Sequence, residues 1–123
     1  MNFKENRPIY MQIADRIADE VLSGALQADS RIPSVREYAA TVEVNANTVV
    51  RSYDYLQQKG VIYNRRGLGY FVAPDAVKIV HDIRREQLLG DELKQVMRQL
   101  ASIGISPDEL KDIYANYLKS NNE

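Results

Sequence analysis

The sequence predicts a mainly α-helical fold with one small β-hairpin and two helices at the C-terminal end. Three observations predict this fold class. Apolar residues recur at helical spacing along most of the chain, capping residues and glycines divide these stretches, and two short β-prone runs flank a glycine-containing turn. A chain of 123 residues fits one small domain with an appendage.

The first predicted helix begins after Pro8. Apolar residues at every fourth position from Ile9 to Val21 form one stripe, which is typical of a helix that packs on a core. Gly24 follows this stripe and marks a C-terminal stop.

The next two predicted helices are joined by a very short turn. Ser34 and Glu37 form a capping box, in which the hydroxyl caps the helix and the carboxylate reaches back to the backbone. Residues 43–44 form the turn, and Asn45 caps a helix that ends at Gly60. Two helices joined in this way form a helix-turn-helix.

A β-hairpin is predicted to follow these helices. The β-prone runs Val61–Tyr63 and Tyr70–Val72 flank an Arg-Arg tip, and Gly67 and Gly69 permit the positive φ that a tight reversal needs. Three helices followed by this hairpin form a winged helix-turn-helix, with the hairpin as its wing.

A second segment is predicted after the wing. We expect residues 1–74 to form the winged helix-turn-helix domain and residues 75–123 to form a helical element. Its first helix extends over Ala76–Ile103, with Gly90 as a point where it bends or weakens. A second capping box at Ser106 begins the last helix.

Composition excludes several classes of function. The chain has no cysteine, which excludes disulfides and thiol chemistry, and its single histidine, His81, lacks neighbours at metal-ligand spacing. We therefore expect no metal, no cofactor and no catalytic activity. The sequence shows no signal peptide and no apolar run as long as a membrane span, so we expect a cytoplasmic protein with no membrane partner.

The charge of the chain is unevenly distributed. The formal net charge is −1, yet residues 31–70 carry six Lys and Arg against three Asp and Glu. The local field governs encounters with a charged partner more than the total does. This basic middle segment favours double-stranded DNA as a partner.

Polar side chains crowd the start of the second helix of the helix-turn-helix. A recognition helix reads base edges with its N-terminal residues, which here are Asn45, Ala46, Asn47 and Thr48, with Arg51 one turn later. Asparagine amides pair with adenine, and a threonine hydroxyl serves a base or a phosphate. The alternative is that Asn45 and Thr48 only cap the helix. The hairpin that follows favours DNA.

Three further arginines are candidates for phosphate contacts. Arg36 lies in the first turn of its helix, where a cation opposes the helix dipole, and this mild penalty indicates a phosphate nearby. Arg65 and Arg66 lie at the wing tip, from which they can enter a minor groove or touch phosphates. The alternative is that all three are solvated surface residues.

The string RIPSVREYAATVEVNANTVVRSYDYLQQKGVIYNRRGLGYFV resembles the DNA-binding domain of GntR-type bacterial regulators. The resemblance covers about residues 8–73, and the NTVVRSY segment with the short tail resembles the YtrA-like subfamily. It implies that Arg36 contacts DNA, that residues 45–48 and Arg51 lie at the groove, and that Gly67 lies at the wing tip. It also implies that the tail is a two-helix dimerisation element.

This sequence departs from the family pattern at two positions. Many members carry arginine where this chain has Ala46, and some carry another where it has Val50. The operator sequence therefore does not carry over from the resemblance, and the sequence gives no indication of a small-molecule effector.

The tail contains more apolar residues than two helices can bury between themselves, which indicates an interface. The predicted homodimer interface consists of Leu89, Leu93, Val96, Met97, Leu100, Leu110, Ile113, Tyr114 and Tyr117. We therefore expect a dimeric, sequence-specific DNA-binding regulator, acting as a repressor on a palindromic operator. The alternative is a winged-helix module that binds proteins and not DNA, for which an uncharged wing would be expected.

Overall fold

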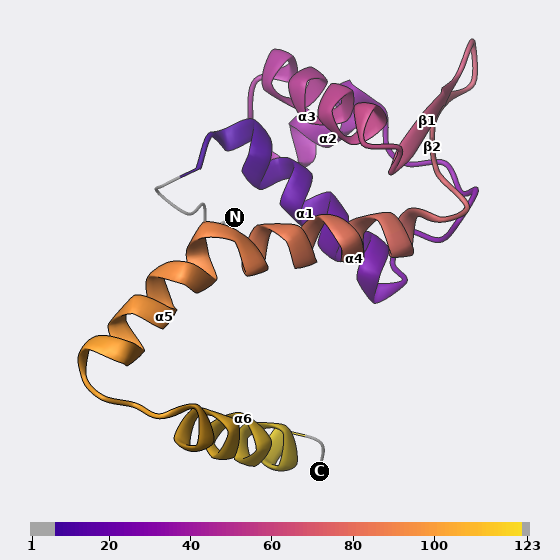
Figure 1. Cartoon of the computed structure of the whole chain (residues 1–123). Coiled ribbons are helices and arrows are strands. Elements are labelled where there is room, and N and C mark those ends of the chain that lie inside the picture. Colours follow the sequence, from indigo (N-terminus) through magenta and orange to yellow (C-terminus); the bar gives the residue numbers. More distant parts are fainter. Residues whose placement is uncertain (1–6, 122–123) are drawn as a thin grey trace. The chain divides into compact units, whose positions relative to one another are not determined.

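The computed structural model describes residues 7–121. The chain divides into two compact units, unit 1 ending at Ile83 and unit 2 beginning at Arg84. In unit 1 the elements are α1 (Ile9–Ser23), α2 (Val35–Val42), α3 (Ala46–Gln58), β1 (Ile62–Arg65), β2 (Gly69–Val72) and the first part of α4 (Ala76–Gln87). This order confirms the predicted mainly α-helical fold with a hairpin wing, which projects beyond the helices (Figure 1).

The helix boundaries follow the capping chemistry of the sequence. The Ser34 hydroxyl accepts a hydrogen bond from the backbone N–H of Glu37, and the Ser34 N–H donates to the Glu37 carboxylate, so the predicted capping box is confirmed. Glu43 then adopts the left-handed conformation at φ 58°, which ends α2 and turns the chain toward α3. Gly60 has φ 83° directly after α3, as its predicted role as a stop requires.

The core of unit 1 lies where α1, α2, α3 and the wing meet. Tyr53 of α3 is at its centre, fully buried, with its hydroxyl donating to the Pro33 carbonyl at 2.7 Å. The apolar stripe of α1 is buried from Ile13 to Val21, whereas Ile9 is 49% exposed, so the predicted stripe is wrong at its first member. The first turn of α1 extends past the core.

The wing is an antiparallel pair with a third segment along its other edge. Ile62 pairs with Val72 and Arg65 with Gly69. On the far side of β2, residues 29–32 run alongside the strand: the Asp29 N–H donates to the Val72 carbonyl, the Val72 N–H donates to the Ser30 carbonyl, and the Ile32 N–H donates to the Tyr70 carbonyl. At Val72, β2 therefore has hydrogen-bonded neighbours on both edges. These bonds fix the base of the wing to the segment that precedes α2.

The start of α4 belongs to the core of unit 1. Ala76 and Val80 are buried, and Ile79 and Ile83 pack against the same cluster. Unit 1 therefore extends past the boundary at residue 74 that the sequence suggests, because the helical stripe after that boundary faces the winged core.

Unit 2 contains the end of α4, a single π-helical turn η1 (Leu88–Glu92), α5 (Leu93–Ser102) and α6 (Pro107–Asn121). The predicted helix over residues 76–103 is interrupted at Gly90, whose backbone is non-helical at φ −83° and ψ −130°. Without a Cβ, glycine adopts such a conformation at little steric cost, which confirms Gly90 as the weak point. The last helix begins as predicted, with the Ser106 hydroxyl accepting from the Glu109 N–H at 3.1 Å.

No helix within residues 7–121 has both the length and the hydropathy needed to cross a membrane.

Candidate nucleic-acid interface

The exposed face of α3 begins at its first residue. Ala46, Asn47, Val50 and Arg51 are exposed and share one side of the helix by their spacing, whereas Val49 on the opposite side is fully buried. All the predicted recognition residues except the half-buried Thr48 are thus exposed, on a helix whose other side packs in the core. The exposed side of α3 is therefore not used in packing.

The two asparagines at the start of α3 have different tasks. The Asn45 Oδ1 accepts a hydrogen bond from the Asn47 backbone N–H at 2.8 Å, so this oxygen caps the helix. The side chain of Asn47 forms no hydrogen bond with any residue in the described part of the chain. Thr48 is half-buried, and its backbone N–H donates to the Asn45 carbonyl at 3.0 Å. Of the two asparagine side chains, only that of Asn45 is therefore used in capping the helix.

Helix α1 holds the recognition helix in place through Tyr10. The Ser52 hydroxyl donates to the Tyr10 carbonyl at 2.7 Å, with the Thr48 carbonyl 3.1 Å from the same hydroxyl. The Cζ of Arg51 lies 4.3 Å from the centroid of the Tyr10 ring. This cation–π contact holds the Arg51 guanidinium on the exposed side of α3.

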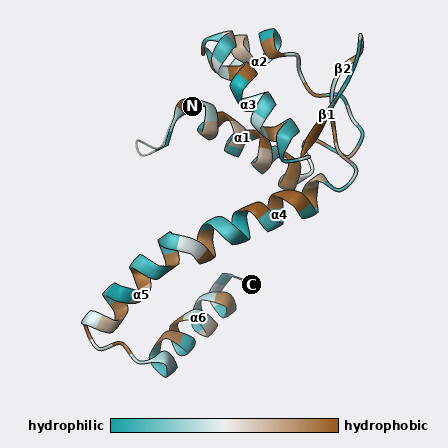
Figure 2. Cartoon of the chain, turned by 45° about the horizontal axis from the view of Figure 1, so that its top comes forward, coloured by the Kyte–Doolittle hydropathy of each residue, from teal (hydrophilic) through white to brown (hydrophobic). Residues whose placement is uncertain are grey.

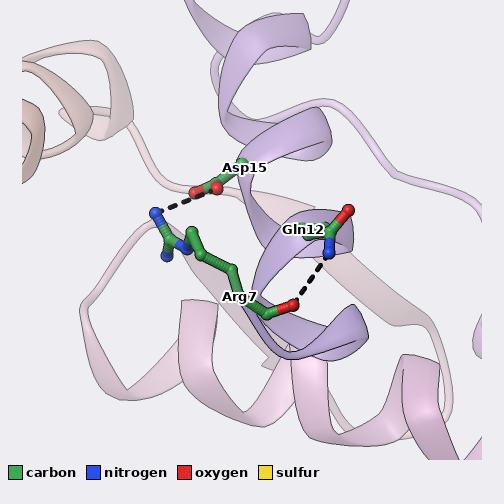
Figure 3. A network of polar contacts seen from close by, with 3 residues as sticks. All are labelled: Arg7, Gln12 and Asp15. Carbon is green, nitrogen blue, oxygen red and sulfur yellow. Dashed lines mark hydrogen bonds and ion pairs between the residues drawn. The ribbon is translucent and has the colours of Figure 1, made fainter. Parts of the chain in front are cut away.

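A polar network fixes the start of α1 and therefore Tyr10 (Figure 3). The Nε2 of Gln12 donates to the Arg7 carbonyl at 2.8 Å, and the Arg7 guanidinium lies 3.1 Å from the Asp15 carboxylate. Pro8 at the N-cap provides no side-chain hydrogen bond, so these contacts stabilise the first turn of α1 instead.

Arg36 lies in the first turn of α2 and is exposed. Beside it, hydrogen bonds from the backbone and then from the side chain of Ser34 keep the pKa of the Glu37 carboxyl below its usual value, with a smaller contribution from the Arg31 charge. The ionised Glu37 is thus used to cap the helix. Arg36 forms no ion pair within residues 7–121, so its charge remains available to an anion.

The tip of the wing carries the other predicted cations. Arg65, Arg66 and Gly67 are exposed, and the Leu68 N–H donates to the Arg65 carbonyl at 2.8 Å to close the turn. The Cζ of Arg65 lies 5.9 Å from the Phe71 ring centroid. Neither arginine forms an ion pair with a described carboxylate. The tip is therefore positively charged and lacks a bulky side chain at Gly67.

One arginine at the wing lies outside the predicted set. Arg31 is exposed, forms a β-bridge with Phe71, and places its Nε 3.1 Å from the point that a Cβ on Gly69 would occupy. Arg31 and Arg65 thus reach Gly69 from opposite edges of β2. The contact joins segments far apart in the sequence, so only the local excess of arginine could have indicated this residue.

The residues of the predicted dimer interface lie in unit 2 and are uncovered. No residue of η1, α5 or α6 is buried; Val96 is 48% exposed and Tyr114 is 63% exposed. Leu89, Met97, Ile113 and Tyr117 are also exposed, and Leu93, Leu100 and Leu110 are partly buried. Apolar stretches are visible among polar ones along α5 and α6 in Figure 2.

In the described part of the chain, no three His, Cys, Asp or Glu side chains gather as a metal site would require. His81 lies on α4 and is exposed.

Residues 9–72 match the family described as bacterial regulatory proteins, gntR family. Two relatives come from Bacillus subtilis (strain 168). The HTH-type transcriptional regulator YhcF is 34% identical over 88% of this chain and 88% of its own length. The HTH-type transcriptional repressor YtrA is 28% identical over 89% of this chain and 83% of its own length.

Solved structures agree with these matches. A GntR-family transcriptional regulator from Bacteroides thetaiotaomicron is 50% identical with a TM-score of 0.83, over 92% of this chain and 98% of that one. The DNA-binding domain of AraR, solved in complex with operator ORR3, is 26% identical with a TM-score of 0.54, over 59% of this chain and 88% of that one. The present chain belongs to the gntR family of bacterial regulatory proteins and is a YtrA-like DNA-binding transcriptional regulator.

Proposed function

We propose that this regulator is a homodimeric repressor that binds a palindromic double-stranded operator with α3 and its wing. The observation that supports this most directly is the start of α3, where an unengaged amide and a guanidinium are exposed on a helix whose opposite side is buried. Because such a face offers donors and acceptors without a partner inside the protein, it is suited to base edges.

Each residue of the interface has a role in this proposal. Asn47 reads a base edge, with adenine as the base that an amide pairs with in bidentate fashion. Arg36 contacts phosphates, as do Arg65 and Arg66, and Gly67 lets the backbone of the tip approach the DNA closely. Asn45 and Thr48 define the helix start, and Ala46 and Arg51 flank Asn47 on the exposed face.

An additional phosphate contact is proposed for Arg31. Its guanidinium lies beside Gly69, and Arg31 borders β2 on the edge opposite to β1, the strand that carries Arg65. Two cations on the two segments that flank β2 attract a phosphate backbone more strongly than either does alone.

Dimerisation is assigned to unit 2. The apolar side chains of α5 and α6 lack a covering layer within the described residues, and an apolar surface of this kind is unfavourable in water. A two-fold dimer buries it and presents two copies of α3 to a palindrome, which raises affinity through avidity. The repressor role is supported by the similarity to YtrA, whose name describes a repressor. The cytoplasm, where the bacterial chromosome lies, is the location that this role requires.

The rival function, a winged-helix module that binds proteins and not DNA, is not favoured. It requires a wing without charge, whereas Arg65 and Arg66 are both exposed at the tip.

The proposed interface is tested by measuring DNA affinity as a function of salt. We expect Arg36→Ala to weaken binding to all sequences alike and to reduce the slope of log affinity against log salt by about 1, because one phosphate contact releases about one counterion. Lys78→Ala is the control, since Lys78 is exposed on α4 and pairs with Asp82. Fluorescence anisotropy with the same slope and affinity for Arg36→Ala and the wild type would contradict the assignment.

A further inference from the structure

We propose that Ala46 and Val50 form an apolar strip that contacts thymine methyl groups, so that the operator half-site has A·T pairs beneath the first two turns of α3. The inference rests on the proposed function, because it assigns a sequence preference to the same interface.

The strip is visible in the burial of α3. Ala46 and Val50 are four residues apart, which places them on one side of the helix, and both are exposed, Val50 by 40%. Asn47 and Arg51 lie beside them on the same exposed face. Val49, by contrast, is fully buried. The face that a recognition helix turns to the groove is therefore apolar at two of its four leading positions.

The exposure of Val50 has no structural benefit within the chain. A β-branched residue is a weaker helix former than alanine or lysine, and at an exposed position no packing offsets that cost. Single apolar residues on a surface are common. Here, however, two of them lie next to the amide that is free to read a base, where a partner surface is expected.

Elementary chemistry selects the base pair that fits this strip. Guanine presents two acceptors in the major groove and cytosine a donor, and neither Ala46 nor Val50 can donate or accept a hydrogen bond. Covering those polar edges would remove their water without replacing its hydrogen bonds, which is unfavourable. Thymine is the base that presents an apolar group in the major groove, its C5-methyl, and burial of a methyl group against alanine or valine is favourable.

The neighbouring amide fits the same base pair. If Asn47 pairs with an adenine, the thymine opposite that adenine or beside it brings a methyl group to the edge of the same groove. Asp54 follows one turn after Val50 on the exposed face, and its carboxylate repels phosphates. Close approach is therefore confined to the first two turns, where the strip lies.

The test begins with a sequence selected by the protein itself. The full-length wild type is used to enrich binders from a library of random DNA duplexes, and each thymine of the resulting half-site is then replaced in turn by deoxyuridine. This substitution removes the C5-methyl group and leaves base pairing unchanged. At the positions under the strip we expect about fourfold weaker binding per methyl group lost, the value for one buried apolar carbon.

A double-mutant cycle assigns the methyl contact to its residue. In Val50→Ala the deoxyuridine substitution that weakens the wild type should have a clearly smaller effect, because the side chain that met the methyl group is gone. Val77→Ala is the matched control: Val77 is 50% exposed on α4, and the same truncation there should leave the deoxyuridine effect at its wild-type size.

Two results would overturn the inference while leaving the proposed function in place. One is a selected half-site whose thymines can all be replaced by deoxyuridine without loss of affinity. The other is an equal deoxyuridine effect in Val50→Ala and in the wild type. Enrichment of no sequence at all would contradict sequence-specific binding itself, and the inference would fail with it.

Discussion

Replacement of Gly69 by alanine tests how Arg31 packs against the wing. Gly69 has φ +113°, a conformation that residues with a Cβ rarely adopt. The Nε of Arg31 lies 3.1 Å from the position that a Cβ on Gly69 would occupy. The backbone strain in Gly69→Ala should lower the free energy of unfolding by about 1–3 kcal/mol. A further cost arises because the Nε of Arg31 must move by a few tenths of an ångström or leave the wing.

Gly24→Ala is the matched control for this substitution. Gly24 also has a positive φ, +85°, but no atom lies within 4 Å of the position of its Cβ. Its replacement should cost about 1–2 kcal/mol from left-handed strain alone. Urea unfolding at one fixed protomer concentration, since a dimer's stability depends on concentration, gives the free energy of unfolding for both variants.

The double variant Arg31→Ala/Gly69→Ala separates the two contributions. If the new methyl group pushes against the guanidinium, removal of that side chain should recover part of the loss, and the two substitutions should couple by at least about 0.5 kcal/mol. Gly69→Ala should also lower DNA affinity by displacing the Arg31 charge. Strict additivity in the free energy of unfolding, with unchanged DNA affinity in Gly69→Ala, would refute this account of the wing.

Three further predictions concern the core, the capping box and unit 2. Tyr53→Phe should lower the free energy of unfolding by about 0.5–1.5 kcal/mol, because the hydrogen bond to the Pro33 carbonyl is lost, whereas Tyr38→Phe should be nearly neutral, since that buried hydroxyl has no partner in the described residues. The depressed pKa of Glu37 means that its stabilisation is complete above the ordinary carboxyl pKa and is lost as pH falls through the folded-state value; acid titrations of Glu37→Gln should lack this component. Leu93→Glu should yield a monomer by light scattering while the exposed control Lys119→Glu remains dimeric, and a wild-type monomer at micromolar concentration would contradict the dimer.

The parts of the fold that depend on local chemistry could be predicted from the sequence. The capping box at Ser34 and the stop at Gly60 were predictable because cap hydrogen bonds and left-handed conformations involve residues within a few positions of each other. The exposure of Asn47 and Arg51 followed in the same way, from the position of buried Val49 on the opposite side of one helix.

The parts that depend on tertiary packing could not be predicted. The burial of Val80 in the winged core and the approach of Arg31 to Gly69 join segments distant in sequence, which no local pattern encodes. The sequence identified Gly90 as a weak position in the helix but did not predict a break there. The low helical propensity of glycine is a small contribution to the free energy, and tertiary contacts decide whether the helix continues or breaks. The role of each exposed residue toward DNA stays a prediction.

Hydroxyl-radical footprinting on the selected operator tests the central claim most directly. A two-fold dimer that places one α3 in each of two major grooves should protect two half-sites related by symmetry, with centres about one helical turn of DNA, or a multiple of it, apart. Protection of a single half-site would contradict the dimeric arrangement, and uniform cleavage under conditions of saturation would contradict the interface itself.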